Sequence, residues 1–315
     1  MTKVTIIGTG SVGSTIAYTM AVQGIASEIV MIDINNTKAS GEAMDINQGT
    51  PFMSPVKVYA GTYRDAIASD IVIITSGIAR KPGQTRLDLT RTNVGILKTI
   101  SAQITKYAPG AIYIIVSNPV DILTYVFNKI SGIPENRIIG SGTILDTARL
   151  RSRIADYYNI NKQNIHACVY GEHGDSSFVP WSMCSISNIE IDKYYDCLEL
   201  NKDTPIPRLD YNEVENYIKK SGGEVISKKG ATFYAVAVSV CHIVKCIFSE
   251  ADTSMTVSSM MHGEYGIEDV ALSILTIVGK NGIIGKIKTP LTEEEQAKLR
   301  YSADCLRKII DQIEI

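Results

Sequence analysis

Short, continuous apolar runs alternate with longer helical patterns through the first 140 residues of the chain. We predict strands at 3–8, 28–33, 56–60, 70–75, 111–116 and 137–140. These runs lack the alternation of a strand that has one face in water, so they are typical of a parallel sheet covered by helices on both faces. Six such strands predict a doubly wound α/β sheet, which binds its ligand at the carboxyl ends of the strands.

The pattern changes after residue 141. The second half predicts an α+β fold with a helix at 143–158, a strand at 165–170, a long helix around 222–248, an antiparallel pair near 254–262 and 269–278, and a final helix at 292–313. We therefore expect two domains, a dinucleotide-binding domain at 1–141 and a substrate domain at 142–315.

A glycine-rich segment follows the first strand. Gly8, Gly10 and Gly13 have the spacing G-x-G-x-x-G, a helical pattern runs from Ser14 to Gln23, and the second strand ends at Asp33. This order is the dinucleotide-binding fingerprint of a Rossmann domain. The first glycine permits the tight turn, the second lets a pyrophosphate approach the backbone, and the third allows helix and strand to pack closely. The diphosphate would then lie at a helix N-terminus.

The acid at the end of the second strand indicates which dinucleotide binds. Asp33 is expected to accept hydrogen bonds from the adenosine ribose hydroxyls, whereas a 2′-phosphate would meet carboxylate repulsion. No arginine lies within four residues of Asp33. The sequence therefore predicts NAD rather than NADP.

Composition and charge exclude several other classes. A net charge of −2 gives no electrostatic attraction for nucleic acid or an anionic membrane. The chain begins almost directly on a strand, so no secretory signal is expected, and no apolar run is long enough to span a bilayer. The six cysteines include no C-x-x-C pair, which favours buried thiols in a reducing cytoplasm over disulfides or a metal site.

The segment Gly171–Asp175 contains the candidate proton carrier, His173. Histidine has an intrinsic pKa close to neutrality, so it can give a proton to a ketone oxygen and take one from an alcohol. Taken alone, the residue is explained equally well as an ordinary loop histidine.

Five motifs in order make the chain resemble the lactate/malate dehydrogenase family of 2-hydroxy acid oxidoreductases over essentially its whole length. They are the glycine motif with Asp33, and the segments Ala79–Asp88, Val116–Asp121, Gly140–Arg149 and Gly171–Asp175. The resemblance implies an NAD-dependent enzyme that transfers hydride between NADH and a 2-keto acid, and it implies a homotetramer. A non-catalytic NAD sensor or an NAD-using glycosidase is a weaker alternative, because the residues for catalysis are all present and a Cys/His metal site has no clear candidate.

The resemblance also supplies roles for charged residues. Asp146 would orient His173 and stabilise its imidazolium. Arg149, three residues further along the same helix, would grip the substrate carboxylate with both arms of its guanidinium. Arg86 belongs to the segment 77–90, which we interpret as a lid that brings this guanidinium to the reacting carbonyl.

Further positions follow from the same resemblance. Asn118 would hydrogen-bond the carbonyl oxygen or the nicotinamide region, and Thr232 matches a substrate-binding position of lactate enzymes. Cofactor-lining residues are expected at Val12, Tyr63, Gly77, Thr99, Val116 and Ser141.

The choice of substrate depends on Arg80. In the family, lactate enzymes usually carry glutamine at this lid position and malate enzymes carry arginine. Oxaloacetate has a second carboxylate that needs a cation, and removing one partner of a buried ion pair costs about 3–5 kcal/mol. Glu172 and Thr232, however, match the lactate branch. We predict malate dehydrogenase of the lactate-dehydrogenase-like type, with L-lactate dehydrogenase as the alternative; a solvated surface arginine at position 80 would remove the argument for malate.

Two more cations form a candidate effector site. Arg151 and His166 match the positions at which many bacterial lactate dehydrogenases bind fructose 1,6-bisphosphate between subunits. Two cations can hold a phosphate. They are equally explained as a surface arginine on a helix and a histidine at a strand.

Overall fold

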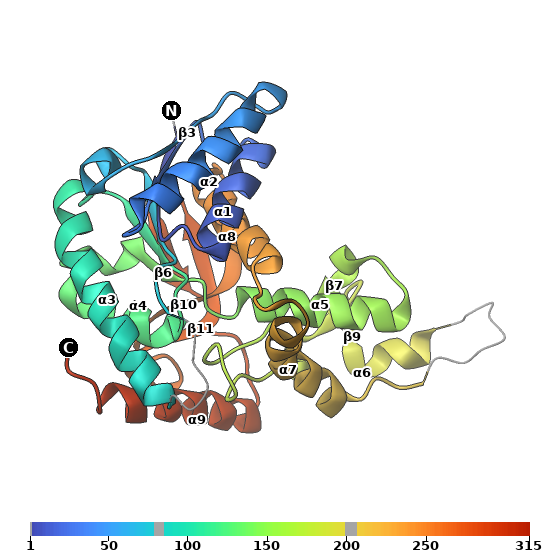
Figure 1. Cartoon of the computed structure of the whole chain (residues 1–315). Helices are drawn as coiled ribbons and strands as arrows, with labels where there is room; N and C mark the ends of the chain where they lie inside the picture. Colours follow the sequence, from blue (N-terminus) through green and yellow to red (C-terminus); the bar gives the residue numbers. More distant parts are fainter. Residues whose placement is uncertain (1, 79–84, 199–206) are drawn as a thin grey trace.

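A nine-stranded sheet forms the centre of the computed structural model, which describes residues 2–78, 85–198 and 207–315 (Figure 1). Its parallel part has the spatial order β3-β2-β1-β4-β5-β6, so the strand order reverses between β1 and β4. This is the doubly wound arrangement that the sequence predicts. The six parallel strands are β1 (Lys3–Ile7), β2 (Glu28–Ile32), β3 (Lys57–Ala60), β4 (Ile71–Ile74), β5 (Ile112–Ile115) and β6 (Ile138–Gly140).

Helices cover both faces of the sheet, as the continuous apolar runs require. Every residue of β4 and β5 is buried. One face packs against α1 (Ser11–Gln23), α2 (Asn36–Gly49) and α8 (Tyr234–Phe248). The other face packs against α3 (Arg86–Tyr107), α4 (Val120–Ile130) and α9 (Glu293–Ile310). No helix among the described residues combines the length and the apolar character that a membrane span requires.

The second half of the chain continues the same sheet. The predicted antiparallel pair is present as β10 (Thr253–His262) and β11 (Glu268–Gly279), with β12 (Gly282–Lys286) beside it. The pair joins the parallel part where Ser258 faces Gly140. The strands therefore form one sheet across the predicted boundary at 141, and the division into two domains stays a prediction.

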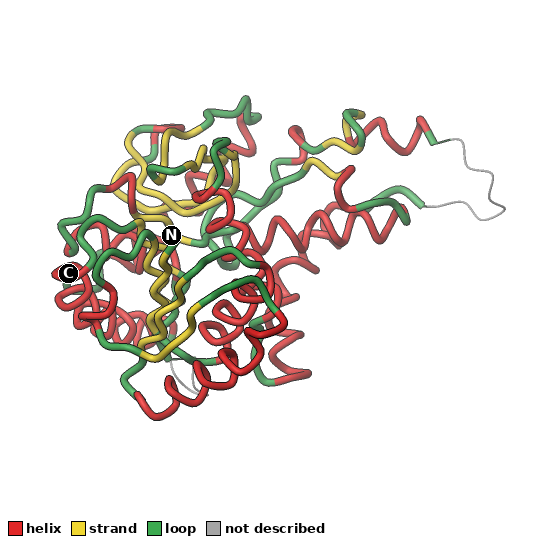
Figure 2. The backbone as a smooth tube through the Cα atoms, turned by 90° about the horizontal axis from the view of Figure 1, so that it is seen from above, coloured by secondary structure: helices red, strands yellow, loops and turns green. Residues whose placement is uncertain are grey.

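A smaller lobe projects from one side of the sheet (Figures 1 and 2). It has its own apolar core, formed largely by residues of α5 and α7 and of the short strands. The lobe contains α5 (Ile144–Tyr158), β7 (Ile165–His166), β8 (Ser185–Ile186), β9 (Ile189–Glu190), α6 (Ile191–Tyr194) and α7 (Tyr211–Lys229).

Several predicted elements have different bounds in the structure, and the final helix, predicted at 292–313, ends at Ile310. The long helix at 222–248 is wrong: α7 ends at Lys229 and α8 begins at Tyr234, because Gly230 leaves the helical region with φ +84°. The predicted strand at 165–170 is reduced to β7, and Tyr170 instead forms an isolated bridge with Phe178. The first helix starts at Ser11 rather than Ser14, because the last glycine of the motif already lies inside it.

Candidate active site

The glycine motif forms a tight turn at the carboxyl end of β1. Gly8 has φ +100°, a conformation that side chains with a Cβ rarely adopt. A Cβ on Gly13 would lie 1.8 Å from the carbonyl oxygen of Gly8, so only glycine lets α1 pack this closely. A Cβ on Gly10 would meet no atom within 4 Å. That open space above the helix N-terminus is the place where a pyrophosphate can approach the backbone.

Asp33, the residue directly after β2, carries an ionised carboxylate that can accept hydrogen bonds. Its carboxylate accepts hydrogen bonds from the backbone N–H groups of Thr9, at 2.6 Å, and Asn35, at 2.9 Å. Partial burial acts to raise the pKa of Asp33, but these hydrogen bonds outweigh it and hold the pKa below its usual value. Tyr63 lies close enough that the negative charge of Asp33 contributes to its raised pKa, after burial of the phenol itself. An ionised acid here fits the ribose hydroxyls of NAD.

The other predicted cofactor positions lie mostly near the carboxyl ends of the strands. Asn118 follows β5, and the backbone N–H of Ser141, after β6, bonds to the carbonyl of Ile115. Gly77 lies next to the side chain of Asn93. The remaining positions are Val12 in the first turn of α1, Val116 directly after β5, and Thr99, which is exposed midway along α3.

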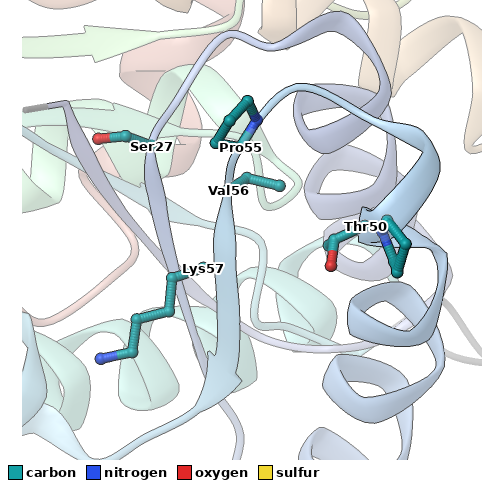
Figure 3. A pocket seen from close by; sticks show the side chains of 6 residues that line it. Ser27, Thr50, Pro55, Val56 and Lys57 are labelled. Atoms are coloured by element: carbon teal, nitrogen blue, oxygen red, sulfur yellow. The ribbon is translucent and has the colours of Figure 1, made fainter.

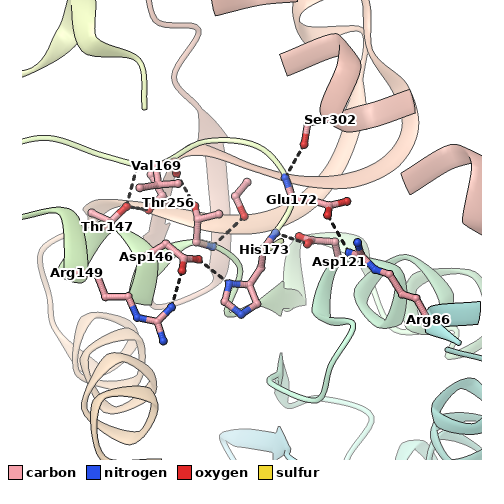
Figure 4. A network of polar contacts seen from close by, with 12 residues as sticks. Arg86, Asp121, Asp146, Thr147, Arg149, Val169, Glu172, His173, Thr256 and Ser302 are labelled. Atoms are coloured by element: carbon pink, nitrogen blue, oxygen red, sulfur yellow. Dashed lines mark hydrogen bonds and ion pairs between the residues drawn. The ribbon is translucent and has the colours of Figure 1, made fainter. Parts of the chain in front are cut away.

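The candidate proton carrier is part of a continuous chain of contacts (Figure 4). His173 Nδ1 lies 2.5 Å from Asp146 Oδ2, and Arg149 Nη1 donates to Asp146 Oδ1 at 2.8 Å. The carboxylate of Asp146 is almost fully buried in the first turn of α5. One acid thus contacts both the imidazole and the guanidinium. From the sequence we expected the contact with His173 but not the one with Arg149, and the functional roles of the three residues stay predictions.

The electrostatics of this pair favour a charged imidazole. The negative charge of Asp146 raises the pKa of His173; burial opposes the shift, and the hydrogen bond between the two residues adds to it. Burial would raise the pKa of Asp146, but the positive charge of His173 and the contact with Arg149 hold it below its usual value. The ionised form of His173 is therefore stabilised by a fixed anion, as a proton donor requires.

The other predicted substrate-binding residues that the structure describes lie in separate parts of the fold. Arg86 is the first residue of α3, and its Nη2 donates to Glu172 Oε1 at 2.8 Å, directly beside His173. The guanidinium of Arg149 lies against α7, where a Cβ on Gly222 would be 3.5 Å from Nη2. Thr232 lies in the short link between α7 and α8. Arg80 lies outside the described residues.

Two polar residues that the sequence analysis did not single out hold the site together. The Oδ2 atom of Asp121 accepts the backbone N–H of His173 at 2.7 Å. Asn93 accepts the N–H of Ile78 and donates to the carbonyl of Asn118, so it connects two predicted ligand-binding segments. The sequence could have indicated Asp121, because it is a carboxylate in the otherwise apolar start of α4. No sequence pattern indicates Asn93.

The candidate effector residues lie in the projecting lobe. Arg151 and His166 are both exposed, and Arg151 Nε donates to the carbonyl of Ala167, the residue after His166. The two side chains thus come from adjacent backbone segments of α5 and β7. Their function as an anion site stays a prediction.

A cavity of about 500 Å³ lies at the other end of the strands (Figure 3). It lies near the first residues of β2 and β3, and it is lined by Ser27, Thr50, Pro51, Pro55, Val56 and Lys57. None of these is a predicted site residue. In a parallel sheet ligands bind at the carboxyl ends, so we do not assign the chemistry to this cavity.

Comparisons with known proteins cover the whole chain. Residues 2–140 match the family model for the lactate/malate dehydrogenase NAD-binding domain, and residues 143–315 match the model for the alpha/beta C-terminal domain. The chain is 49% identical to an L-lactate dehydrogenase of Thermoanaerobacter sp. (strain X514), with 100% of both chains covered. It is 45% identical to L-lactate dehydrogenase 1 of Clostridium acetobutylicum, over 99% of this chain and 98% of that protein. A solved minor L-lactate dehydrogenase from Enterococcus mundtii superposes with a TM-score of 0.92 at 38% identity, over 100% of this chain and 99% of that one.

Proposed function

The chain belongs to the lactate/malate dehydrogenase family, and we propose that it is an L-lactate dehydrogenase, which reduces pyruvate to L-lactate with NADH. The observation that carries this choice is the full-length identity of 45–49% to proteins named L-lactate dehydrogenase. It favours the alternative of the sequence analysis over malate dehydrogenase, for which Arg80 is the main support.

The residues of the cofactor site fit NAD. The open space above Gly10 accepts a diphosphate, and the ionised Asp33 accepts hydrogen bonds from ribose hydroxyls. NADH bound there supplies the hydride. The protein then has to orient the keto acid and deliver a proton to its oxygen.

Three side chains carry out these steps in our proposal. Arg149 binds the carboxylate that pyruvate and oxaloacetate share, because a guanidinium can hold both carboxylate oxygens at once. Arg86 polarises the ketone oxygen and stabilises the negative charge that develops on it. His173 transfers its proton to that oxygen and is left neutral, with Asp146 holding the ring through Nδ1 so that Nε2 is the transferring atom. L-Lactate oxidation reverses each step.

Malate dehydrogenase is the second candidate function. A cation at position 80 would pair with the second carboxylate of oxaloacetate, whereas the methyl group of pyruvate would leave that cation without a partner. The two substrates differ only in this substituent, so a single comparison separates the functions.

The test measures kcat/KM for pyruvate and for oxaloacetate with NADH, in the wild type and in Arg80→Gln. We expect pyruvate to be the better substrate of the wild type. If oxaloacetate is preferred by tenfold or more, the lactate assignment is wrong. A fall in the ratio of oxaloacetate to pyruvate activity by two to four decades in the variant, from the loss of about 3–5 kcal/mol, would identify Arg80 as the residue that selects the dicarboxylate.

Three broader expectations also stay part of the proposal. We infer a homotetramer in the cytoplasm, and activation by fructose 1,6-bisphosphate through Arg151 and His166. Activity that does not change with added sugar bisphosphate, at low pyruvate and near-neutral pH, would argue against the effector site.

A further inference from the structure

A buried carboxylate with no role in the mechanism above lies next to the proton carrier. Glu172 is 1% exposed, and its Oε1 accepts a hydrogen bond from Arg86 Nη2 at 2.8 Å. Its backbone N–H donates to Ser302 Oγ on α9 at 2.8 Å, so the residue is fixed at both ends. Burying a carboxylate without a counter-charge is costly. Arg86 supplies that charge.

The backbone around the ion pair leaves room for it. A Cβ on Gly174 would lie 2.2 Å from Glu172 Oε1 and 3.0 Å from Arg86 Nη2. Any other residue at position 174 would therefore require the Glu172 carboxylate to move. The glycine thus leaves room for the ion pair beside the loop that presents His173.

Glu172 and His173 are consecutive, and each contacts a charged group from another part of the fold (Figure 4). The Glu172 side chain points to Arg86 of α3, and the His173 side chain points to Asp146 of α5. This dipeptide is therefore the connection between the Arg86 guanidinium and the His173–Asp146–Arg149 chain. Arg86 is a long side chain at the start of a helix and is 42% exposed even with this contact in place, so Glu172 supplies a fixed partner for a guanidinium that lies partly in solvent.

We propose that Glu172 is a positioning residue, which holds the guanidinium of Arg86 at a set place relative to the imidazole of His173. The inference rests on the proposed function, because it requires Arg86 and His173 to act on one carbonyl oxygen. The guanidinium polarises that oxygen and the imidazole protonates it, so the spacing of the two groups decides whether both reach it. Misplacement of a catalytic group by about 1 Å can cost on the order of 100-fold in rate.

The test is a double-mutant cycle of Glu172→Gln and Arg86→Gln, with kcat and KM measured for pyruvate and NADH binding measured by fluorescence. Glu172→Gln keeps the shape of the side chain and an acceptor oxygen but removes the charge. We expect kcat/KM to fall about 10- to 100-fold, mainly through kcat, with NADH affinity unchanged. In the Arg86→Gln background the same substitution should change kcat/KM by less than about twofold, because the residue it positions is gone.

A matched control separates positioning from stability. Glu295 is another buried glutamate, which accepts hydrogen bonds from Ser182 and from the backbone of Thr292 at the start of α9, and neither partner is a predicted site residue. We expect Glu295→Gln to lower Tm and to leave kcat unchanged. If Glu172→Gln does not fold, Glu172→Asp retains the charge but withdraws it by one methylene, and it should show the same loss in kcat.

Three results would overturn the proposal. They are unchanged kcat/KM in Glu172→Gln, an equal loss in the wild-type and Arg86→Gln backgrounds, and a gain in activity, which would mean that Glu172 restrains Arg86. A wild type with no activity on either keto acid would instead refute the proposed function. Thermal unfolding of the same single and double variants would then still test the contact between Glu172 and Arg86. Additive changes in Tm would show that Glu172 does not hold Arg86.

Discussion

The substitution Asp146→Asn tests most directly whether a buried anion supports His173, the proposed proton donor. The nearest atoms of Asp146 and His173 are 2.5 Å apart, and the carboxylate is almost fully buried. Opposite charges with centres about 4 Å apart attract by about 4 kcal/mol at an effective dielectric constant of about 20. Because the side chain of His173 is 26% exposed, we take about 2–4 kcal/mol as the range. That energy corresponds to about 30- to 1000-fold in rate.

The pH dependence gives the sign of the effect. Asp146 raises the pKa of His173, so the substitution lowers this pKa and deprotonates the imidazole at a lower pH. Keto-acid reduction needs the protonated ring. We therefore expect kcat/KM for pyruvate to fall about 30- to 1000-fold at about pH 8, with a smaller loss at about pH 6, because the alkaline limb of the profile moves to lower pH.

The assay records NADH consumption from about pH 5 to 9 for the wild type, Asp146→Asn and a control. Asp156→Asn is the control, because it makes the same change on the exposed side of α5, where Asp156 pairs with Lys162 at 3.5 Å. Its profile should match the wild type. An alkaline limb of Asp146→Asn that stays in place, or a kcat/KM within threefold of wild type at about pH 8, would refute the assigned role of the acid.

Two further predictions concern the cofactor turn and the buried anchor of the histidine. Gly13→Ala should lower Tm sharply, because its Cβ would lie 1.8 Å from the Gly8 carbonyl oxygen. Gly10→Ala should leave Tm unchanged, because its Cβ meets no atom within 4 Å, but it should weaken NADH binding in a titration. Burial raises the pKa of Asp121 to about 6, above its ordinary 3.8, so the folded state loses stability as pH rises from about 4 to 6. Asp121→Asn keeps an acceptor for the His173 N–H but cannot ionise. Its free energy of unfolding relative to wild type, measured by urea titration, should therefore increase by about 3 kcal/mol as the pH rises from about 4 to 6. A difference that does not change with pH would contradict this prediction.

Local patterns predicted the parts of the site that lie within one segment. The glycine spacing with Asp33 predicted a turn that the structure contains, and the i, i+3 spacing predicted Asp146 and Arg149 on one helix face. The break between α7 and α8 was missed, because Lys229 to Phe233 contains only one helix-breaking residue, Gly230, between two good helical patterns.

The sequence by itself determined the alternation of strands and helices in the nucleotide-binding half and the glycine turn with Asp33 that indicates NAD, because each is encoded by residue type and spacing within a short segment. The pairing of His173 with Asp146, 27 residues away, came from the family resemblance. Only the tertiary structure decided which groups from distant segments meet. Arg86 and Glu172 are 86 residues apart, and His173 and Asp121 are 52 apart. Their contacts follow from the packing of α3, α4 and α9 on one face of the sheet, and no local pattern carries that information.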